Sequence, residues 1–181
     1  MPAGVETVIE LVRHAKAHSR DRWWGRPDRE RPLTDVGMDQ SRALAKELHS
    51  GAPIAKLFSS PWTRCLQTLD PLADTLGVHA VEEDVLGEVV SLPVHDGGDA
   101  WVTSAWLGGR AVGFVDRVVT TYAGKRVVAC SHGDVIPALV ALVVGRDGLD
   151  VTDVRCKKGG RFTLTFSDAR CVDATYHPPP D

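Results

Sequence analysis

Residues 7–13 read TVIELVR and residues 126–130 read RVVAC, and these two stretches decide the fold. Each is a short, mostly apolar run with β-branched residues, which is typical of a buried strand. Predicted helices alternate with such strands along the chain, and this alternation indicates an α/β sheet that is mostly parallel. In such sheets the reactive groups gather at the carboxyl ends of the strands. The residues that follow the two runs are therefore the first candidates for function.

The other elements follow from turn residues and apolar spacing. Pro61 is expected at the first position of a second helix, and Pro71 is expected to kink or restart that helix. Residues 83–109 carry no clear pattern, and residues 14–33 form a loop long enough to suggest a function. The last two predicted strands form a hairpin, so the sheet gains a late antiparallel edge. Further strands are predicted at residues 56–59, 78–82, 161–166 and 171–176, and further helices at residues 34–50, 111–122 and 133–144.

The composition is that of an ordinary globular protein, with 43% hydrophobic and 25% charged residues in a chain of 181. We expect one domain over residues 1–181, with a frayed tail at residues 178–181. The net charge of −3 argues against a general nucleic-acid-binding protein. The longest apolar run, residues 135–144, is about half of the roughly 20 residues that span a membrane.

The sequence shows no features of export. The N-terminus has no basic segment before its apolar stretch, so no secretory signal is expected. The chain has 4 cysteines, and none of them forms a C-x-x-C pair. We therefore expect reduced, mostly buried thiols and a cytoplasmic location.

Two histidines and two arginines fall at the predicted carboxyl edge of the sheet. His14 follows the first strand, and His132 follows the RVVAC strand within a Ser-His-Gly-Asp sequence that opens a helix. Arg13 ends the first strand, and Arg64 lies one turn into the second helix. Guanidinium groups and a helix N-terminus favour a phosphoryl group. A lone histidine at a strand end is more often structural, and either arginine could instead pair with an acidic side chain.

Four motifs in order along the chain resemble the histidine phosphatase superfamily, the phosphoglycerate-mutase-like group. The resemblance runs from about residue 8 to residue 144. The family usually has R-H-G where this chain has Ala15, as in short members that resemble the phosphohistidine phosphatase SixA, and alanine excludes backbone conformations that only glycine tolerates. The motifs are LVRHAKA (11–17), LTDVGMDQ (33–40), SSPWTRCLQT (59–68) and CSHGDV (130–135).

The resemblance implies a three-layer α/β/α fold with a mostly parallel sheet and an antiparallel edge strand. It implies that His14 is the nucleophile, that Arg13, Arg64 and His132 hold the phosphoryl oxygens, and that water then hydrolyses the phosphohistidine. No cofactor is implied, and no metal-binding motif is present in the sequence.

The general acid is expected in the segment after the third strand. Family members often carry this acid in an L-x-E stretch, which residues 86–88 match, so Glu88 is our candidate for protonating the leaving group. Glu83 and Asp84 are alternatives. All three could instead be solvated loop acids.

The loop at residues 19–31 is expected to influence substrate choice. Arg20, Arg22 and Trp23 are candidates for substrate binding, since arginine and tryptophan together can hold phosphates and stack on a base. Alternatively, the loop arginines pair with the acidic residues of the same loop. This loop and the CKKGG segment also resemble the phosphatase half of mycobacterial two-domain Nudix–histidine phosphatase proteins, which favours a nucleotide or polyphosphate substrate. Lys157 and Lys158 are interpreted as surface charges.

These observations predict a metal-independent phosphatase whose partner is a phosphorylated small molecule, a nucleotide or a phosphoprotein. Stable nucleic-acid binding and membrane binding are not expected. Two other functions stay open: a phosphate- or nucleotide-binding module without turnover, and a phosphoglycerate-type mutase. The short chain favours an open site over the closed pocket that a mutase needs.

Overall fold

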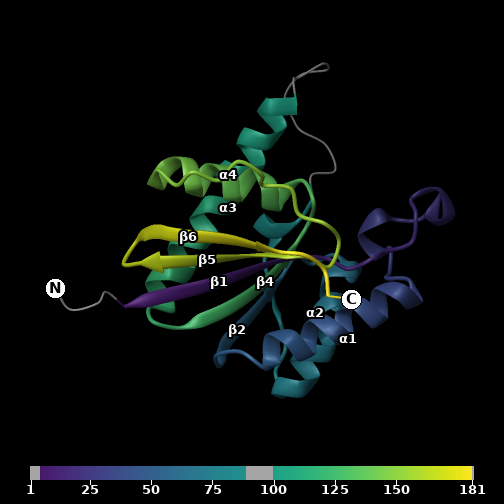
Figure 1. Ribbon diagram of the computed structural model, residues 1–181. Helices are drawn as coiled ribbons and strands as arrows, with labels where there is room; N and C mark the ends of the chain where they lie inside the picture. The colour runs from purple at the N-terminus through teal and green to yellow at the C-terminus, as the bar shows by residue number, and fades with distance from the viewer. Residues whose placement is uncertain (1–4, 89–99, 181) are drawn as a thin grey trace.

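The computed structural model describes residues 5–88 and 100–180, which form a six-stranded sheet with a pair of helices on each face (Figure 1). The strand order is β3-β2-β4-β1-β5-β6. The strands are β1 (Glu6–Arg13), β2 (Ile54–Ser59), β3 (Val81–Glu82), β4 (Arg126–Ser131), β5 (Arg161–Ser167) and β6 (Arg170–His177). The helices are α1 (Asp35–His49), α2 (Thr63–Leu76), α3 (Ala100–Thr121) and α4 (Val135–Asp147), with short 3-10 turns at Asp21–Trp23, Asp28–Glu30 and Asp84–Leu86.

The sheet confirms the predicted α/β fold with a mostly parallel sheet. Strands β1, β2, β3 and β4 run parallel to one another, whereas β5 runs antiparallel to both β1 and β6. The antiparallel strand is therefore one place in from the edge, which β6 occupies. The predicted hairpin is present and turns at Asp168, where φ is 54°.

Two hydrophobic cores explain the three layers. Successive side chains of a strand point to opposite faces of the sheet. In β4, Val127 and Ala129 pack into the core under α3 and α4, whereas Val128 and Cys130 pack into the core over α1 and α2. All four side chains are fully buried, so β4 is apolar on both faces, as its RVVAC sequence predicts.

Helix α1 begins as its sequence predicts, but α2 does not. Thr34 caps α1 by accepting a hydrogen bond from the amide of Gly37. The prediction that Pro61 opens α2 is wrong, because the amide of Ser60 still bonds to Cys130 of the sheet and the helix starts only at Thr63. The helix does not restart at Pro71 but passes through it, with Leu69 and Leu72 held in the core, while a kink at Pro71 stays a prediction.

Helix α3 is longer than predicted. It begins at Ala100 rather than at residue 111, within the segment that the sequence left unassigned. Gly108 weakens the helical signal there, but it allows α3 to approach α4, since a Cβ at that position would lie 2.8 Å from the carbonyl oxygen of Ala138. Within the described residues, no helix has both the length and the hydropathy that crossing a membrane requires.

The C-terminal residues follow β6 as an irregular segment. Residues 178–180 form no helix or strand, but Pro179 and Pro180 are half-buried. Pro179 lies beside Gly159, in the turn that precedes β5. A frayed tail at residues 178–181 stays a prediction, and residue 181 lies outside the described residues.

Candidate active site

The two histidines meet because β1 and β4 are adjacent parallel strands. Arg13 pairs in register with Ser131, and the amide of His14 donates a 3.0 Å hydrogen bond to the carbonyl of Ser131. The imidazole ring centroids of His14 and His132 consequently lie 5.4 Å apart. The carboxyl edge of the sheet thus brings together the residues that the sequence places at its two strand ends.

The His14 side chain is oriented by its own backbone. Its Nδ1 lies 2.8 Å from the carbonyl oxygen of Ala15. A carbonyl only accepts, so Nδ1 carries the proton and Nε2 keeps its lone pair. Burial, reinforced by His132, lowers the pKa of His14 to about 3. At neutral pH the ring is uncharged, as a nucleophile requires.

Arg64 is completely buried in the first turn of α2, where two carboxylates meet its guanidinium group. Its Nη2 lies 2.7 Å from Oε2 of Glu88 and 3.1 Å from Oδ2 of Asp28. Its Nη1 donates a 2.8 Å hydrogen bond to the backbone carbonyl of Asp28. Arg64 is therefore paired with acidic side chains, which is the alternative that the sequence left open. An anion that binds Arg64 has to compete with these carboxylates.

His132 faces Glu88 with one ring nitrogen and Ser60 with the other. Its Nε2 lies 2.7 Å from the hydroxyl of Ser60, and its Nδ1 lies 3.4 Å from Oε1 of Glu88. Burial opposes the charged form of His132, but Cys65 and Glu88 outweigh burial and raise its pKa to about 9. His132 is therefore a second buried cation next to Arg64.

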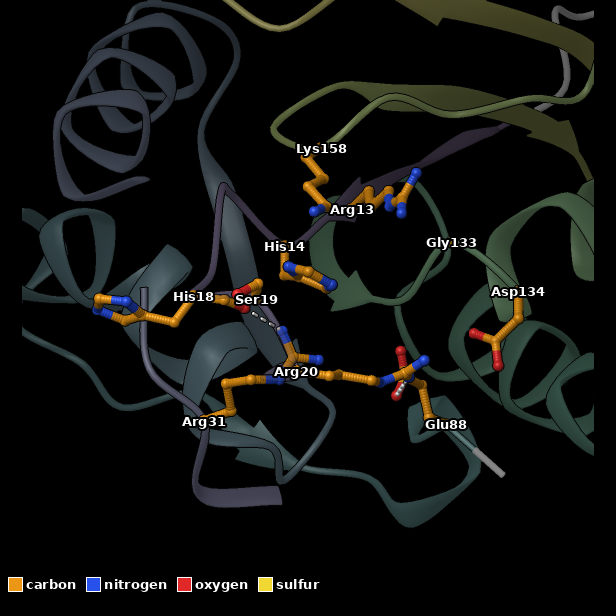
Figure 2. Close-up of a pocket in the computed structure, with 10 residues that line it drawn as sticks. All are labelled: Arg13, His14, His18, Ser19, Arg20, Arg31, Glu88, Gly133, Asp134 and Lys158. Atoms are coloured by element: carbon orange, nitrogen blue, oxygen red, sulfur yellow. Dashed lines mark hydrogen bonds and ion pairs between the residues drawn. The ribbon is translucent and has the colours of Figure 1, made fainter. Parts of the chain in front are cut away.

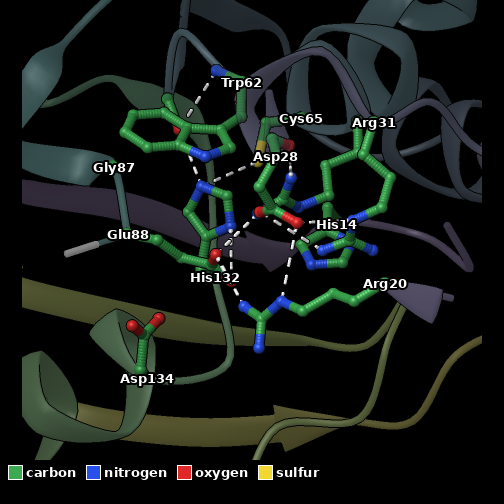
Figure 3. Close-up of polar contacts among 12 residues, drawn as sticks. His14, Arg20, Asp28, Arg31, Trp62, Cys65, Gly87, Glu88, His132 and Asp134 are labelled. Carbon is green, nitrogen blue, oxygen red and sulfur yellow. Dashed lines mark hydrogen bonds and ion pairs between the residues drawn. The ribbon is translucent and has the colours of Figure 1, made fainter. Parts of the chain in front are cut away.

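Glu88 is the acid that reaches this group (Figure 3). It lies among His132, Arg64 and Arg20, whose Nη2 is 3.2 Å from Oε2 of Glu88. Burial raises the pKa of Glu88, but His132 and the two arginines lower it to about 2. The alternative acid Glu83 instead pairs with Arg117 at 2.7 Å.

Arg13 reaches the cavity from the end of β1. Its Nη1 donates a 2.7 Å hydrogen bond to the carbonyl of Cys156, while its Nε is buried without a hydrogen-bond partner. Gly133 makes room for the guanidinium group, because a Cβ there would lie 2.3 Å from Cζ of Arg13.

A cavity of about 430 Å³ opens in front of these groups (Figure 2). Arg20 lines it, as expected of a substrate-binding residue, but Arg22 and Trp23 do not. Trp23 donates from its indole to the carbonyl of Pro27, and Arg26 lies over its ring. A substrate role for Arg22 and Trp23 stays a prediction. The lining residues are Arg13, His14, His18, Ser19, Arg20, Arg31, Glu88, Gly133, Asp134 and Lys158.

Three site residues were not identified from the sequence. Asp28 was expected only to pair with loop arginines; it pairs with Arg31 at 2.8 Å, but it also reaches Arg64. Ser60 carried no signal beyond its place in the SSPWTR motif. Lys158 was interpreted as a surface charge, yet it lines the cavity. The two glycines that follow Lys158 indicate a tight turn, and they are the sequence signal that could have found it.

One group of side chains in the described part of the chain has the geometry to hold a metal ion. A ligand atom from each of His14, Glu88 and His132 lies within 4.8 Å of the others. Arg64 contacts Glu88, and Arg13 lines the same cavity, so positive charge surrounds the group. This charge opposes a cation and favours an anion.

Comparison with known proteins relates this chain to a family of phosphatases. The histidine phosphatase superfamily (branch 1) matches residues 9–91 and 103–176. An 8-oxo-(d)GTP phosphatase of Mycolicibacterium smegmatis is 32% identical over 181 residues, which cover 99% of this chain and 50% of the relative. The chain therefore spans about half the length of that curated relative.

Solved structures share the fold. A phosphoglycerate mutase from Bacillus anthracis has a TM-score of 0.71 and 12% identity, covering 97% of this chain and 93% of the other. The protein histidine phosphatase SixA, complexed with tungstate, has a TM-score of 0.61 and 22% identity, covering 94% of each chain. Together with the match over most of the sequence, these likenesses support one conclusion: the chain belongs to branch 1 of the histidine phosphatase superfamily.

Proposed function

We propose that the protein is a phosphatase that takes a phosphoryl group onto Nε2 of His14 and then transfers it to water. The observation that carries the proposal is the hydrogen bond from Nδ1 of His14 to Ala15, which leaves Nε2 unprotonated beside the cavity. In the first step the Nε2–P bond forms as the bond from phosphorus to the leaving oxygen breaks. In the second step, water attacks the same phosphorus and releases phosphate and free His14.

Three cations provide the electrostatic part of the reaction. Phosphoryl transfer depends mainly on positioning and on neutralising the charge of the phosphoryl oxygens. Arg64 and His132 are buried, and Arg13 lines the cavity in front of them. Buried cations interact strongly with an anion because the surrounding dielectric is low. These residues therefore fit the role of phosphoryl binding without a metal ion.

Glu88 fits the role of general acid once an anion is bound. Without a ligand it is ionised, because the cations around it lower its pKa. A bound phosphoryl dianion adds negative charge next to Glu88, and a like charge raises the pKa of a carboxyl group. The protonated form can then give its proton to the leaving oxygen. The resulting carboxylate can accept a proton from the water that attacks the phosphohistidine.

The substrate classes that fit are a nucleotide or polyphosphate, a phosphohistidine protein and a small phosphomonoester. The name of the Mycolicibacterium smegmatis relative specifies a nucleoside triphosphate, which supports the first class. A binding module would hold phosphate without turnover, and a mutase would return the phosphoryl group to a second hydroxyl.

Hydrolysis of p-nitrophenyl phosphate in the presence of EDTA tests the proposal. We expect turnover that EDTA leaves unchanged and an acid-labile, base-stable phosphoenzyme after rapid quenching with radiolabelled substrate. Binding of phosphate without any turnover would favour the module. Transfer of the label to a second hydroxyl of phosphoglycerate, rather than to water, would favour the mutase.

Glu88→Gln is expected to slow hydrolysis of an alkyl phosphate by roughly 10²- to 10⁴-fold, since an alkoxide leaves poorly without a proton. Hydrolysis of p-nitrophenyl phosphate should fall much less, because nitrophenolate is a weak base. The ratio of kcat/KM for the two substrates measures the effect, and Glu83→Gln is the matched control. Equal losses for both substrates in Glu88→Gln would assign the acid to another residue.

Asp28→Asn is expected to tighten orthophosphate binding by roughly 3- to 10-fold, because the Asp28 carboxylate competes with the ligand for Arg64. Inhibition of p-nitrophenyl phosphate hydrolysis by orthophosphate gives the affinity. Asp21→Asn, a change in the same loop, should leave it unaltered. Weaker inhibition of Asp28→Asn would show that Asp28 supports the site instead of competing with the ligand.

A further inference from the structure

Three arginines and one lysine line the cavity, and they differ in their partners. Among the described residues that line it, Arg20 and Arg31 have carboxylate partners, whereas no carboxylate lies within ion-pair distance of Arg13 or Lys158. Arg13 already belongs to the phosphoryl site of the proposed mechanism. Lys158 is therefore a cation of the cavity wall that has no role in the proposed reaction at His14.

The backbone fixes where Lys158 stands. The next residue, Gly159, donates its amide to the carbonyl oxygens of Arg13 and His14, at 3.1 and 3.2 Å. Gly159 has a φ of +78°, a conformation that favours glycine, so the tight turn depends on having glycine at this position. The turn is thereby attached to the nucleophile's own strand. Figure 2 shows the Lys158 side chain directed toward His14, across the cavity from Glu88.

The electrostatics show that this ammonium group lies in a field of like charge. Burial lowers the pKa of Lys158, and the nearby Arg13, Arg31 and Lys16 lower it further. The Lys158 side chain is exposed, so it keeps contact with water while it lines the cavity beside these cations. An anion in the cavity would relieve the repulsion.

The pairing of the surrounding charges shows where a second anionic group would bind. Arg20, Arg31 and Arg64 are paired with the carboxylates of Asp28 and Glu88. Lys158 lines the same cavity with no carboxylate of the described residues within ion-pair distance, so a second linked phosphoryl group would meet a cation that is not already paired. The cavity volume of about 430 Å³ lies within the range of small-molecule sites. The cavity is therefore larger than one phosphate group needs.

We propose that Lys158 binds a second phosphoryl group of the substrate, so that the protein prefers a compound with two or more linked phosphoryl groups, such as a nucleoside diphosphate or triphosphate. The terminal phosphoryl group occupies the site at His14, and the next one along the chain contacts Lys158. The inference rests on the proposed function for its catalytic part, and it selects one of the three substrate classes. A phosphohistidine protein offers no linked second phosphoryl group.

Lys158→Met tests the proposal, with Lys157→Met as the matched control. Lys157 is adjacent and exposed like Lys158, but it does not line this cavity. For Lys158→Met we expect kcat/KM toward a nucleoside diphosphate to fall roughly 10- to 100-fold, as for a lost charged hydrogen bond, and kcat/KM toward p-nitrophenyl phosphate to change less than about 3-fold. Lys157→Met should alter neither. Equal losses of kcat/KM on both substrates in Lys158→Met, or the same loss in Lys157→Met, would overturn the proposal.

Calorimetric binding separates this inference from the proposed function. Wild-type protein should bind pyrophosphate more tightly than orthophosphate, and Lys158→Met should lose most of that difference. If wild-type protein hydrolyses no phosphate ester but shows the Lys158-dependent preference for pyrophosphate, the proposed function fails and the second subsite stands. If it hydrolyses p-nitrophenyl phosphate but binds the two anions equally, the second subsite fails alone.

Discussion

His14→Ala is expected to reduce phosphatase activity by at least roughly 10³-fold, the scale of loss when a covalent nucleophile is removed. The second ring beside it, His132, is not expected to take its place, since its Nε2 is bonded to Ser60 and its pKa is raised. The measurement is kcat/KM for p-nitrophenyl phosphate, together with phosphoenzyme trapping, which should detect no labelled protein.

The control for this variant is His79→Ala, which removes an exposed histidine outside the cavity and should keep full activity. Binding of tungstate or vanadate to His14→Ala should persist, because the cations remain. Substantial hydrolysis by His14→Ala, with labelled phosphoenzyme still formed, would move the nucleophile to another residue.

The pH profile of the wild-type protein follows from the same side chain. With its pKa lowered to about 3, His14 is unprotonated from pH 8 down to pH 5. Protonation of the nucleophile should therefore reduce kcat/KM only as the pH falls toward 3. A loss of phosphoenzyme formation centred near pH 6.5, the ordinary range of histidine, would contradict the environment described for His14.

Arg64→Ala is expected to weaken vanadate and orthophosphate inhibition by about 2–3 kcal/mol, or roughly 30- to 150-fold. The guanidinium group is fully buried and already meets two carboxylates, so its loss removes a charged donor and leaves Glu88 and Asp28 facing each other. Arg64→Lys should recover only part of the affinity, because an ammonium group cannot form the two parallel bonds of a guanidinium group.

Urea unfolding accompanies this measurement, because a buried arginine also contributes to stability. Arg42→Ala, an exposed arginine of α1, is the control and should change neither stability nor inhibition. If Arg64→Ala stays folded and its inhibition constants equal those of the wild-type protein, Arg64 does not bind the phosphoryl group.

Much of the fold was predictable because it follows from local signals. The TVIELVR and RVVAC stretches form β1 and β4, and the neighbouring parallel strands place His14 beside His132. The start of α2 was predicted incorrectly because the preference of proline for a first turn is local, whereas Ser60 is held by a hydrogen bond to a distant strand.

The other contacts of the site depend on the route of the chain between distant segments, which the local sequence does not encode. Asp28 reaches Arg64 only because the loop after β1 folds back over α2. Lys158 reaches the cavity because the Gly159 turn bonds to the end of β1, which lies far away in the sequence. Contacts of this kind are set by tertiary packing, so composition and spacing identify the candidates but not their partners.

The bond from the His14 amide to Ser131 joins the two innermost strands of the sheet. Amides in such positions open only with the whole domain, whereas loops open locally at little cost. We therefore expect His14 and His132 to lie beside the most slowly exchanging amides of the sheet, while Asp28 and Lys158 lie in the connecting segments. Divergence among relatives with this architecture can then alter what is recognised through changes in two loops, without disturbing the chemistry at the centre.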